Sequence, residues 1–384
     1  MGHPTFSQNT TWSDGLSVKR NTIKKITIVD KFDRPENFTC EWNAAASDSD
    51  PIMCYVVDAE LIISGNGTGK IYTNKDASKM FGRISSGNNY FEQLTEIDGL
   101  DLLDTSKTTN MSTMFQMCWK VKELDLSNFN TSNVTNMQGM FSGATISNVD
   151  YFMELETIKG IENFDVSKVE NLYFTFAKCA NLTALDLSRW AVTNRCITLR
   201  QTFYQCGILQ KLIGIGDWDT SGVVGINGEK GMSGTFAACS NLKELDLKNW
   251  DTSSATDMAD MFMNMNHLQK LVLGSKFSLS GNGNIPQANR ATIPTPSNAY
   301  IEGADGKWHT IHGDSFTSDA LPSGINVTYY AIEAAAQEDL AKLKQTFVLV
   351  DGYTAVGIGD ALREKAGTYG DLKPSEWAET IRSI

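Results

Sequence analysis

The side chains best suited to metal chemistry are His309 and His312, which stand in the segment HTIH. Two imidazoles at this spacing can bind one metal ion, but a site needs a third ligand and the surrounding pattern supplies none. His3 lies in the N-terminal segment and His267 lies within repeated sequence, so neither completes a catalytic group. We therefore expect no metal site, no cofactor and no catalytic residue, and we predict that the protein is not an enzyme.

The chain has seven cysteines, an odd number, and no two of them form a CxxC pair of the kind that zinc and thiol redox sites use. Four recur at one point of a repeat: Cys118, Cys179, Cys206 and Cys239. Side chains stacked in parallel rarely reach the dihedral angle of a disulfide. We expect reduced thiols that pack in the core.

The glycine-rich stretch GNGTG at 65–69 resembles a phosphate loop only in composition. A phosphate loop precedes a helix and usually contains a Lys-Ser/Thr pair, and neither is present here. We expect a connecting loop that binds no phosphate.

Charge and hydropathy limit the partners. The chain has 384 residues and a net charge of -12, with no run of Lys or Arg, so we expect no nucleic-acid partner. No stretch approaches the roughly 20 apolar residues that span a bilayer, so we expect no membrane insertion. The first residues lack the basic and apolar regions of a secretion signal, which predicts a chain made and kept in a cytoplasm.

A repeat organises the middle of the chain. Phenylalanines recur at intervals of 26 to 35 residues, namely Phe81, Phe115, Phe141, Phe176, Phe203, Phe236 and Phe262. An apolar residue precedes most of them by four positions, as Met111 precedes Phe115, and a compact one follows three positions later. Positions i, i+3 and i+4 share a helical face, so we predict a short helix in each of about seven units.

Alternating leucines then predict a strand with one buried face in each unit. The pairs are Leu124 and Leu126, Leu185 and Leu187, Leu245 and Leu247, and Leu271 and Leu273. Turns such as Trp250-Asp-Thr-Ser follow, built from residues whose side chains bond to nearby backbone. Longer spacings mark insertions near 143–160 and 220–232, which we predict to be exposed binding loops.

The pattern MxxMFxxCxxLxxLDLSxFDTSNVTxM resembles the BspA-like leucine-rich repeat family of bacterial surface proteins over about residues 70–275. The resemblance implies an α/β repeat, a leucine-rich-repeat-like solenoid with a small N-terminal β unit or cap and a small C-terminal helical element. We expect a β-rich unit at 1–70, the solenoid at 71–277, an irregular cap or linker at 278–331 and a helical element at 332–384. The helix predicted at 332–347 either docks on its own cap or pairs between subunits.

The last residues, GIGDALREKAGTYGDLKPSEWAETIRSI, resemble a short element found in tail and other virion proteins of phages of gut Firmicutes. Leu362, Trp377 and Ile381 belong to its small apolar cluster, and we predict that they make assembly contacts.

Three tryptophans, Trp190, Trp218 and Trp250, recur at the corner between strand and turn. They either stack inside the repeat or form a partly exposed row that faces a sugar or a protein partner.

These resemblances imply a non-enzymatic phage virion protein, in a tail fibre, a baseplate or a head decoration, that presents the repeat surface for host-cell attachment. Its partners would be other virion proteins and a host surface protein or glycan, with a homo-oligomer on the particle. The alternative is a bacterial cell-surface adhesin of the BspA-like kind that binds a host protein or glycan.

Overall fold

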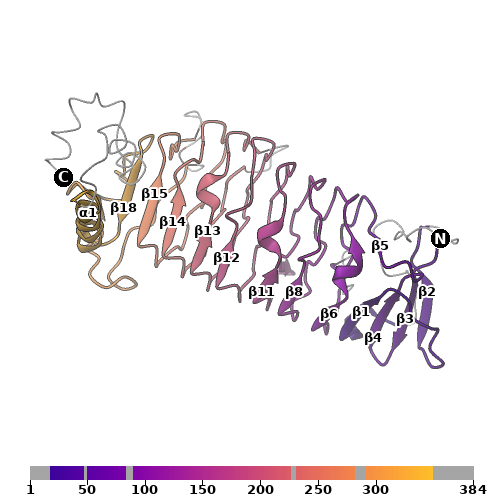
Figure 1. Cartoon of the computed structure of the whole chain (residues 1–384). Coiled ribbons are helices and arrows are strands. Elements are labelled where there is room, and N and C mark those ends of the chain that lie inside the picture. The colour runs from indigo at the N-terminus through magenta and orange to yellow at the C-terminus, as the bar shows by residue number, and fades with distance from the viewer. Residues whose placement is uncertain are drawn as a thin grey trace.

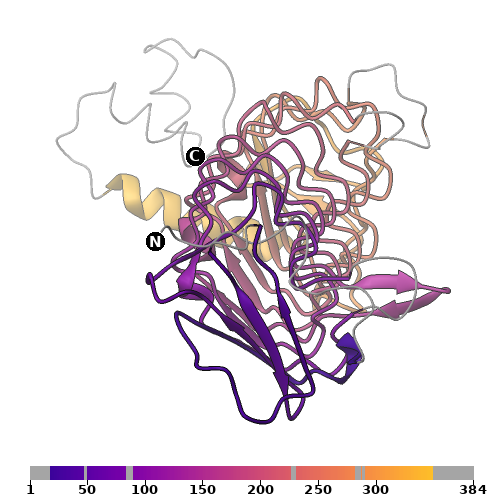
Figure 2. The ribbon, with the colours of Figure 1, turned by 90° about the vertical axis from the view of Figure 1, so that its right-hand side faces the viewer.

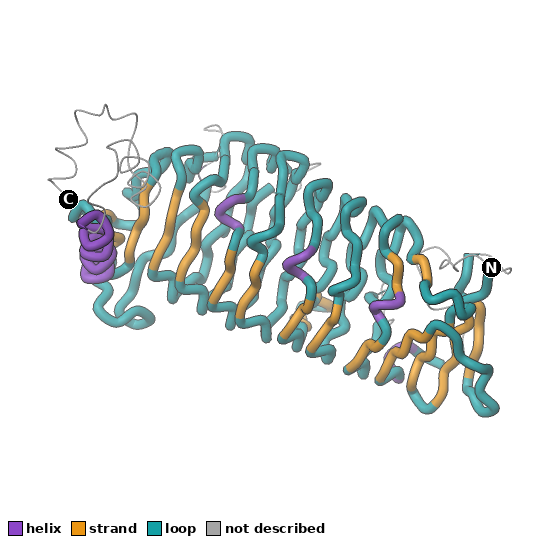
Figure 3. Tube along the Cα trace, viewed as in Figure 1, coloured by secondary structure: helices purple, strands orange, loops and turns teal. Residues whose placement is uncertain are grey.

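The computed structural model describes residues 18–46, 50–83, 90–225, 231–281, 287 and 290–348. Short strands follow one another along an elongated body, from an N-terminal sheet to a C-terminal helix (Figure 1). Figure 3 shows that turns and loops make up most of the chain between them.

The N-terminal sheet has five strands in the order β2-β3-β4-β1-β6. Its strands are β1 (Lys25–Val29), β2 (Cys40–Asn43), β3 (Met53–Val57), β4 (Glu60–Ser64) and β6 (Glu96–Asp98), and the 3-10 helix η1 (Arg20–Thr22) precedes them. β1 runs parallel to both β4 and β6. Because β6 lies at residues 96–98, this sheet extends past the boundary expected at residue 70 and joins the repeated part of the chain.

The middle of the chain forms small parallel sheets. β5 (Ile71–Tyr72) pairs with β7 (Leu103–Asp104), and β8 (Glu123–Asp125) pairs with β11 (Thr157–Lys159). β12 (Ala184–Asp186) pairs with β13 (Lys211–Ile213), and β14 (Glu244–Leu247) with β15 (Lys270–Leu273). Three units add a 3-10 helix after a left-handed glycine: η2 (Leu100–Leu102), η3 (Ile161–Asn163) and η4 (Ile215–Asp217).

The C-terminal end closes with an antiparallel strand. β18 (Val327–Tyr330) pairs with β15 and also with β16 (Trp308–His309), which pairs with β17 (Ser315–Phe316). Residues 278–331, expected to be irregular, therefore contribute three strands. The helix α1 (Glu333–Val348) follows, and its Asp339 accepts hydrogen bonds of 2.7 Å from both Lys270 and Tyr330.

α1 packs on its own chain. Its Ala336, Leu340 and Leu343 lie against Ile311 and Tyr330. Docking on the cap is thus the arrangement that the structure shows for this helix. Within the described residues, no helix has the length and apolar character needed to cross a membrane.

The expected fold class, an α/β leucine-rich-repeat-like solenoid, is wrong. The described residues form four two-stranded and two five-stranded sheets, and α1 is the one α-helix among them. The short helix predicted around each phenylalanine is a pair of tight turns, in which Met114 N–H donates to Met111 O and Cys118 N–H to Phe115 O. Two successive four-residue turns bring the same positions inward as a helix would, so the apolar spacing was misread.

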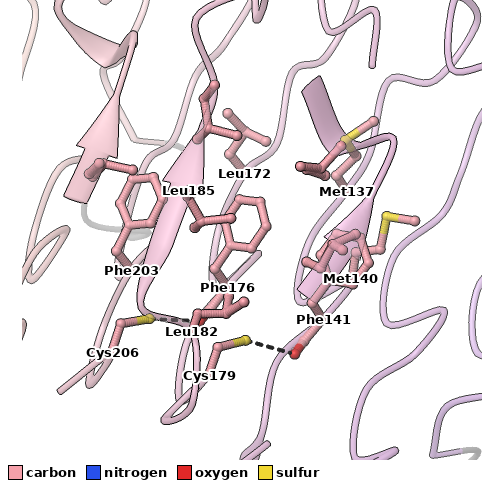
Figure 4. Packing of buried hydrophobic residues seen from close by; sticks show 14 of the residues in the cluster. Met137, Met140, Phe141, Leu172, Phe176, Cys179, Leu182, Leu185, Phe203 and Cys206 are labelled. Carbon is pink, nitrogen blue, oxygen red and sulfur yellow. Dashed lines mark hydrogen bonds between the residues drawn. The ribbon is translucent and has the colours of Figure 1, made fainter. Parts of the chain in front are cut away.

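The core runs through all the repeated units. Phenylalanine rings of neighbouring units stack with centroid separations of 5.5–6.1 Å, as in the pairs Phe115–Phe141 and Phe203–Phe236. Figure 4 shows Phe141, Phe176 and Phe203 in this row. The phenylalanines, leucines and four cysteines singled out from the repeat are all buried. One apolar interior therefore supports every unit.

Buried polar groups join the units across this core. Cys179 Sγ donates to Phe141 O at 3.3 Å and Cys206 Sγ to Phe176 O at 3.1 Å, so each thiol contacts the preceding unit. The predicted turns are confirmed, since Ser253 N–H donates to Asp251 Oδ1 at 2.9 Å and Thr252 Oγ1 donates to Ser278 O at 3.0 Å. Because the two thiols and the Thr252 hydroxyl are buried and bond to a neighbouring unit, they fix the register of the units.

Candidate functional site

Six equivalent segments form one side of the repeated region, which we call the turn face: 111–118, 137–143, 172–179, 199–206, 232–239 and 258–265. Their backbone N–H groups donate to the next segment along, as from Phe141 to Thr175 O at 3.0 Å and from Phe176 to Thr202 O at 2.9 Å. The third residue of every segment has a left-handed backbone. This regular conformation sets which side chains point outward.

Phe174 occupies such a third position with a φ of 61°. Gly139 and Gly234 stand at the equivalent points of two other segments, where a left-handed backbone costs glycine no steric strain. For a residue with a side chain the conformation costs about 1–2 kcal/mol. Thr113, Gln201 and Asp260 share this conformation at the same position, so it belongs to the repeat, and the aromatic ring is what distinguishes Phe174.

A hairpin projects beside these segments, formed by β9 (Ala144–Ile146) and β10 (Val149–Tyr151). Its two-residue turn, Ser147-Asn148, has both φ angles positive, the geometry that matches the twist of a tight hairpin. Figure 2 shows the hairpin as the pair of magenta arrows extending from the body. Val149 is 52% exposed and Phe152 is 41% exposed, so the hairpin presents apolar side chains to solvent.

Lys178 fixes the hairpin to the turn face. The side chain of Lys178 is 1% exposed and its ammonium forms an ion pair with Asp150 on β10. Asp150 also accepts hydrogen bonds from Thr145 Oγ1 at 2.7 Å and Gln205 Nε2 at 3.4 Å. The Lys178 hydrogen bond, with the one from Thr145, holds the pKa of Asp150 below its ordinary 3.8.

Four rings gather around this ion pair: Phe152, Tyr173, Phe174 and Tyr204, which we call the aromatic patch. The Phe174 centroid lies 4.6 Å from that of Tyr173 and 6.2 Å from that of Tyr204. Lys178 Nζ lies 5.5 Å from the Phe152 centroid and 5.7 Å from that of Tyr204. The three turn-face rings are half-buried, so the patch is held by its neighbours and still reaches solvent.

Arg200 borders the patch, with its guanidinium carbon 5.0 Å from the Tyr173 centroid. Burial, and then the nearby Asp150 and Asp260 charges, raise the pKa of Tyr204, so its hydroxyl is neutral and can both donate and accept hydrogen bonds. The patch therefore combines ring surfaces with a small number of polar groups, an arrangement typical of binding sites.

The opposite side of the hairpin is also packed. The Tyr151 centroid lies 4.7 Å from Trp119, whose ring lies 5.1 Å from Tyr90. Trp119 Nε1 donates to Glu92 O at 2.8 Å. Rings on one side and the ion pair on the other keep the hairpin in one position.

The tryptophans singled out from the sequence lie elsewhere. Trp190, Trp218 and Trp250 are at most 3% exposed and stack with centroid separations of 6.2 and 6.3 Å. Trp190 and Trp250 donate from Nε1 to Ile161 O and Ile215 O, each at 2.8 Å. The candidate row of exposed binding rings is thus wrong, because the corner between strand and turn faces the interior.

Both histidines of the HTIH segment make contacts with nearby residues. His309 is buried and its Nε2 lies 3.0 Å from Asp305 Oδ1, while His312 N–H donates to Thr310 Oγ1 at 3.3 Å. Across the described part of the chain, no three His, Cys, Asp or Glu side chains are grouped closely enough to hold a metal ion. The GNGTG loop leads into strand β5, and Gly69 N–H donates to Asp30 Oδ1 at 2.6 Å.

The candidate assembly residues Leu362, Trp377 and Ile381 lie outside the described residues. The insertion predicted near 143–160 contains the hairpin, whereas that near 220–232 includes residues 226–230, which are also outside them. Sequence reasoning located the first loop but missed Tyr173, Phe174 and Tyr204. The sequence does contain an indication of these three residues. They are aromatic at points of the repeat where most other segments have small or polar residues.

The fold and the site together define a repeated β protein with an aromatic surface on one side. A family model described as "Mycoplasma protein of unknown function, DUF285" matches residues 75–194, 151–228 and 193–281. These overlapping matches span more than half of the chain, and the chain belongs to this family. Comparisons with curated proteins and with solved structures gave no match.

Proposed function

We propose that the chain is a non-enzymatic phage virion protein, in a tail fibre, a baseplate or a head decoration, that attaches to the host-cell surface through the aromatic patch. The observation that carries the proposal is Phe174, a half-buried aromatic ring in a left-handed backbone position beside the hairpin. Aromatic side chains offer large contact areas at low entropic cost, which is why they dominate binding surfaces.

The location in a virion is supported by the resemblance of the last residues to elements of phage virion proteins. In this proposal the C-terminal segment contacts other virion proteins and several copies assemble on the particle. The repeated region then stands away from the particle and presents the turn face to the host.

The test combines particle composition with cell binding. Mass spectrometry of purified virions is expected to find this chain, and the purified full-length protein is expected to bind host cells and compete with the particle for adsorption. A chain missing from the particle contradicts the virion part of the proposal. A purified protein that neither binds cells nor slows adsorption contradicts the attachment part.

One finding favours a second candidate, a bacterial cell-surface adhesin of the BspA-like kind. The matching family is described as a mycoplasma protein, which is a cellular rather than a viral origin. The same aromatic patch would then bind a host protein or glycan. Immunolabelling of intact bacterial cells that carry the gene separates the two, because surface labelling without particles supports the adhesin.

A further inference from the structure

We infer that the turn face binds a neutral polysaccharide, laid across neighbouring units with the aromatic patch as its centre. This inference rests on the proposed function, since it names the class of surface molecule that the attachment site recognises. The argument comes from the charge, the polar groups and the spacing of the turn face.

The turn face is poor in charge. Its six segments contain 47 residues, of which three are charged: Lys178, Arg200 and Asp260. The central strands β8, β11, β12, β13, β14 and β15 contain eight charged residues in twenty. In a chain of net charge -12, the turn face therefore repels or attracts a charged polymer less than the strand side does.

The two cationic side chains of the turn face, Lys178 and Arg200, already contact other residues of the protein. Lys178 is buried and paired with Asp150, while Arg200 lies against the Tyr173 ring. An anionic polymer needs exposed cations that neutralise it in series, and the turn face does not present such a series. A neutral ligand fits this surface better than an anionic one.

The uncharged polar groups suit hydroxyl recognition. Glutamines recur on the turn face at Gln116, Gln138, Gln201 and Gln205, each half-buried. Gln116 Nε2 donates to Ser142 Oγ at 3.0 Å and Gln138 Oε1 accepts from Asn171 Nδ2 at 3.3 Å, so these amides are partly engaged within the protein. A side-chain amide has two donors and an acceptor oxygen, and the groups that remain can pair with hydroxyls that both donate and accept. Among them, Gln205 donates to Asp150 at the base of the hairpin, next to the Tyr204 ring. Amides next to aromatic rings match a sugar, whose C–H faces are apolar and whose edges carry hydroxyls.

The spacing of the units completes the argument. Parallel backbone ladders join neighbouring units, so the backbones repeat at about 4.8 Å, while the stacked phenylalanine centroids beneath the turn face lie 5.5–6.0 Å apart. This repeat is close to the length of one pyranose residue along an extended chain. Successive sugars can therefore meet equivalent positions on successive units, with Tyr173, Phe174 and Tyr204 supplying the ring contacts.

The experiment measures binding of the full-length protein to a panel of gut Firmicutes cells, before and after periodate, which cleaves sugar diols, and before and after protease. Phe174→Gly is expected to reduce binding about tenfold or more, because it removes the central ring. Ala59→Gly is the matched control: it makes the same change at a left-handed position, with a φ of 66°, in the turn between β3 and β4, outside the turn face. The control should bind as the parent does.

Four outcomes are informative. Binding that periodate abolishes and protease leaves, with little change from low to high salt, is the expected result. Binding that protease abolishes and periodate leaves overturns the polysaccharide inference but keeps the attachment function, with a protein receptor instead. Periodate-sensitive binding that falls steeply with salt overturns the neutral class in favour of an anionic polymer. Absent cell binding, or binding that Phe174→Gly leaves intact, overturns the proposed function itself.

Discussion

The turn face and the strand side of the repeated region rest on the same row of buried phenylalanines, yet they present different chemistry to solvent. The strands alternate buried leucines with exposed charges, as Leu124 lies between Glu123 and Asp125. The turn segments point amides, small residues and aromatic rings outward. One core can thus support two independent surfaces, because side-chain direction is set by backbone geometry and the outward residues are free to vary.

The largest expected loss of stability comes from a substitution in the phenylalanine core, which both sides share. Phe176 is fully buried and stacks on Phe141 and Phe203, so Phe176→Ala is expected to lower the free energy of unfolding by about 3–5 kcal/mol. Phe174→Ala, two residues away on the turn face, should cost much less. Denaturant unfolding monitored by circular dichroism measures both, and equal losses would contradict the division between core and surface.

Alkaline pH should weaken the side of the core beneath the turn face. Burial raises the pKa of the Cys118 and Cys196 thiols from an ordinary 9.0 to about 12. A raised pKa in the folded state gives stability that is complete below pH 9 and is lost between pH 9 and 12, at about 1.4 kcal/mol per thiol and pH unit.

Denaturant unfolding at pH 8 and pH 10 checks this expectation. The double variant Cys118→Ala, Cys196→Ala should show a shallower loss over that range than the parent. An identical loss would mean that groups other than these thiols cause the pH dependence.

The tryptophans allow a finer comparison within the core. Trp250 Nε1 donates to Ile215 O, in the unit with helix η4, whereas Trp218 Nε1 is buried with no hydrogen-bond partner among the described residues. Trp250→Phe removes one of the two hydrogen bonds that Ile215 O accepts, the other coming from Trp218 N–H at 3.2 Å, and should destabilise the protein by about 0.5–1.5 kcal/mol more than Trp218→Phe. Thermal or denaturant unfolding of the two variants measures this difference. A larger loss of stability for Trp218→Phe would contradict this account of the packing.

The smallest effect is expected on the strand side. Lys159 on β11 forms an exposed ion pair with Glu123 on β8. Because exposed pairs are screened by solvent, Lys159→Ala should change the free energy of unfolding by less than about 1 kcal/mol. A loss as large as that of a core substitution would show that the strand charges are structural.

Sequence patterns predicted the inward residues but not the backbone that carries them. The spacing of Met111, Phe115 and Cys118 is the same for two helical turns and for two tight turns, so periodicity alone favoured the wrong element. Left-handed residues such as Thr113 and Phe174 select the tight turns over the helix. The residue types at these positions do not indicate a positive φ. Leu124 was correctly predicted as a strand residue with a buried side chain, whereas Leu126 is buried as predicted but lies just after β8 ends.

The candidate site was predictable only in part. The extra residues near 143–160 indicated an exposed loop, because insertions collect where packing does not restrict them. The contact of Lys178 with Asp150 joins segments 28 residues apart, and the ring cluster draws on three repeat units. Such groupings depend on how units stack, which no single stretch of sequence encodes.

The central claim is that attachment uses the turn face and not the strand side. Its most direct test is cell binding by the full-length protein carrying either Phe174→Gly on the turn face or Lys211→Glu on the exposed side of β13. The account predicts that Phe174→Gly loses binding while remaining as stable as the parent, and that Lys211→Glu binds normally. Retained binding by Phe174→Gly together with loss by Lys211→Glu would contradict it.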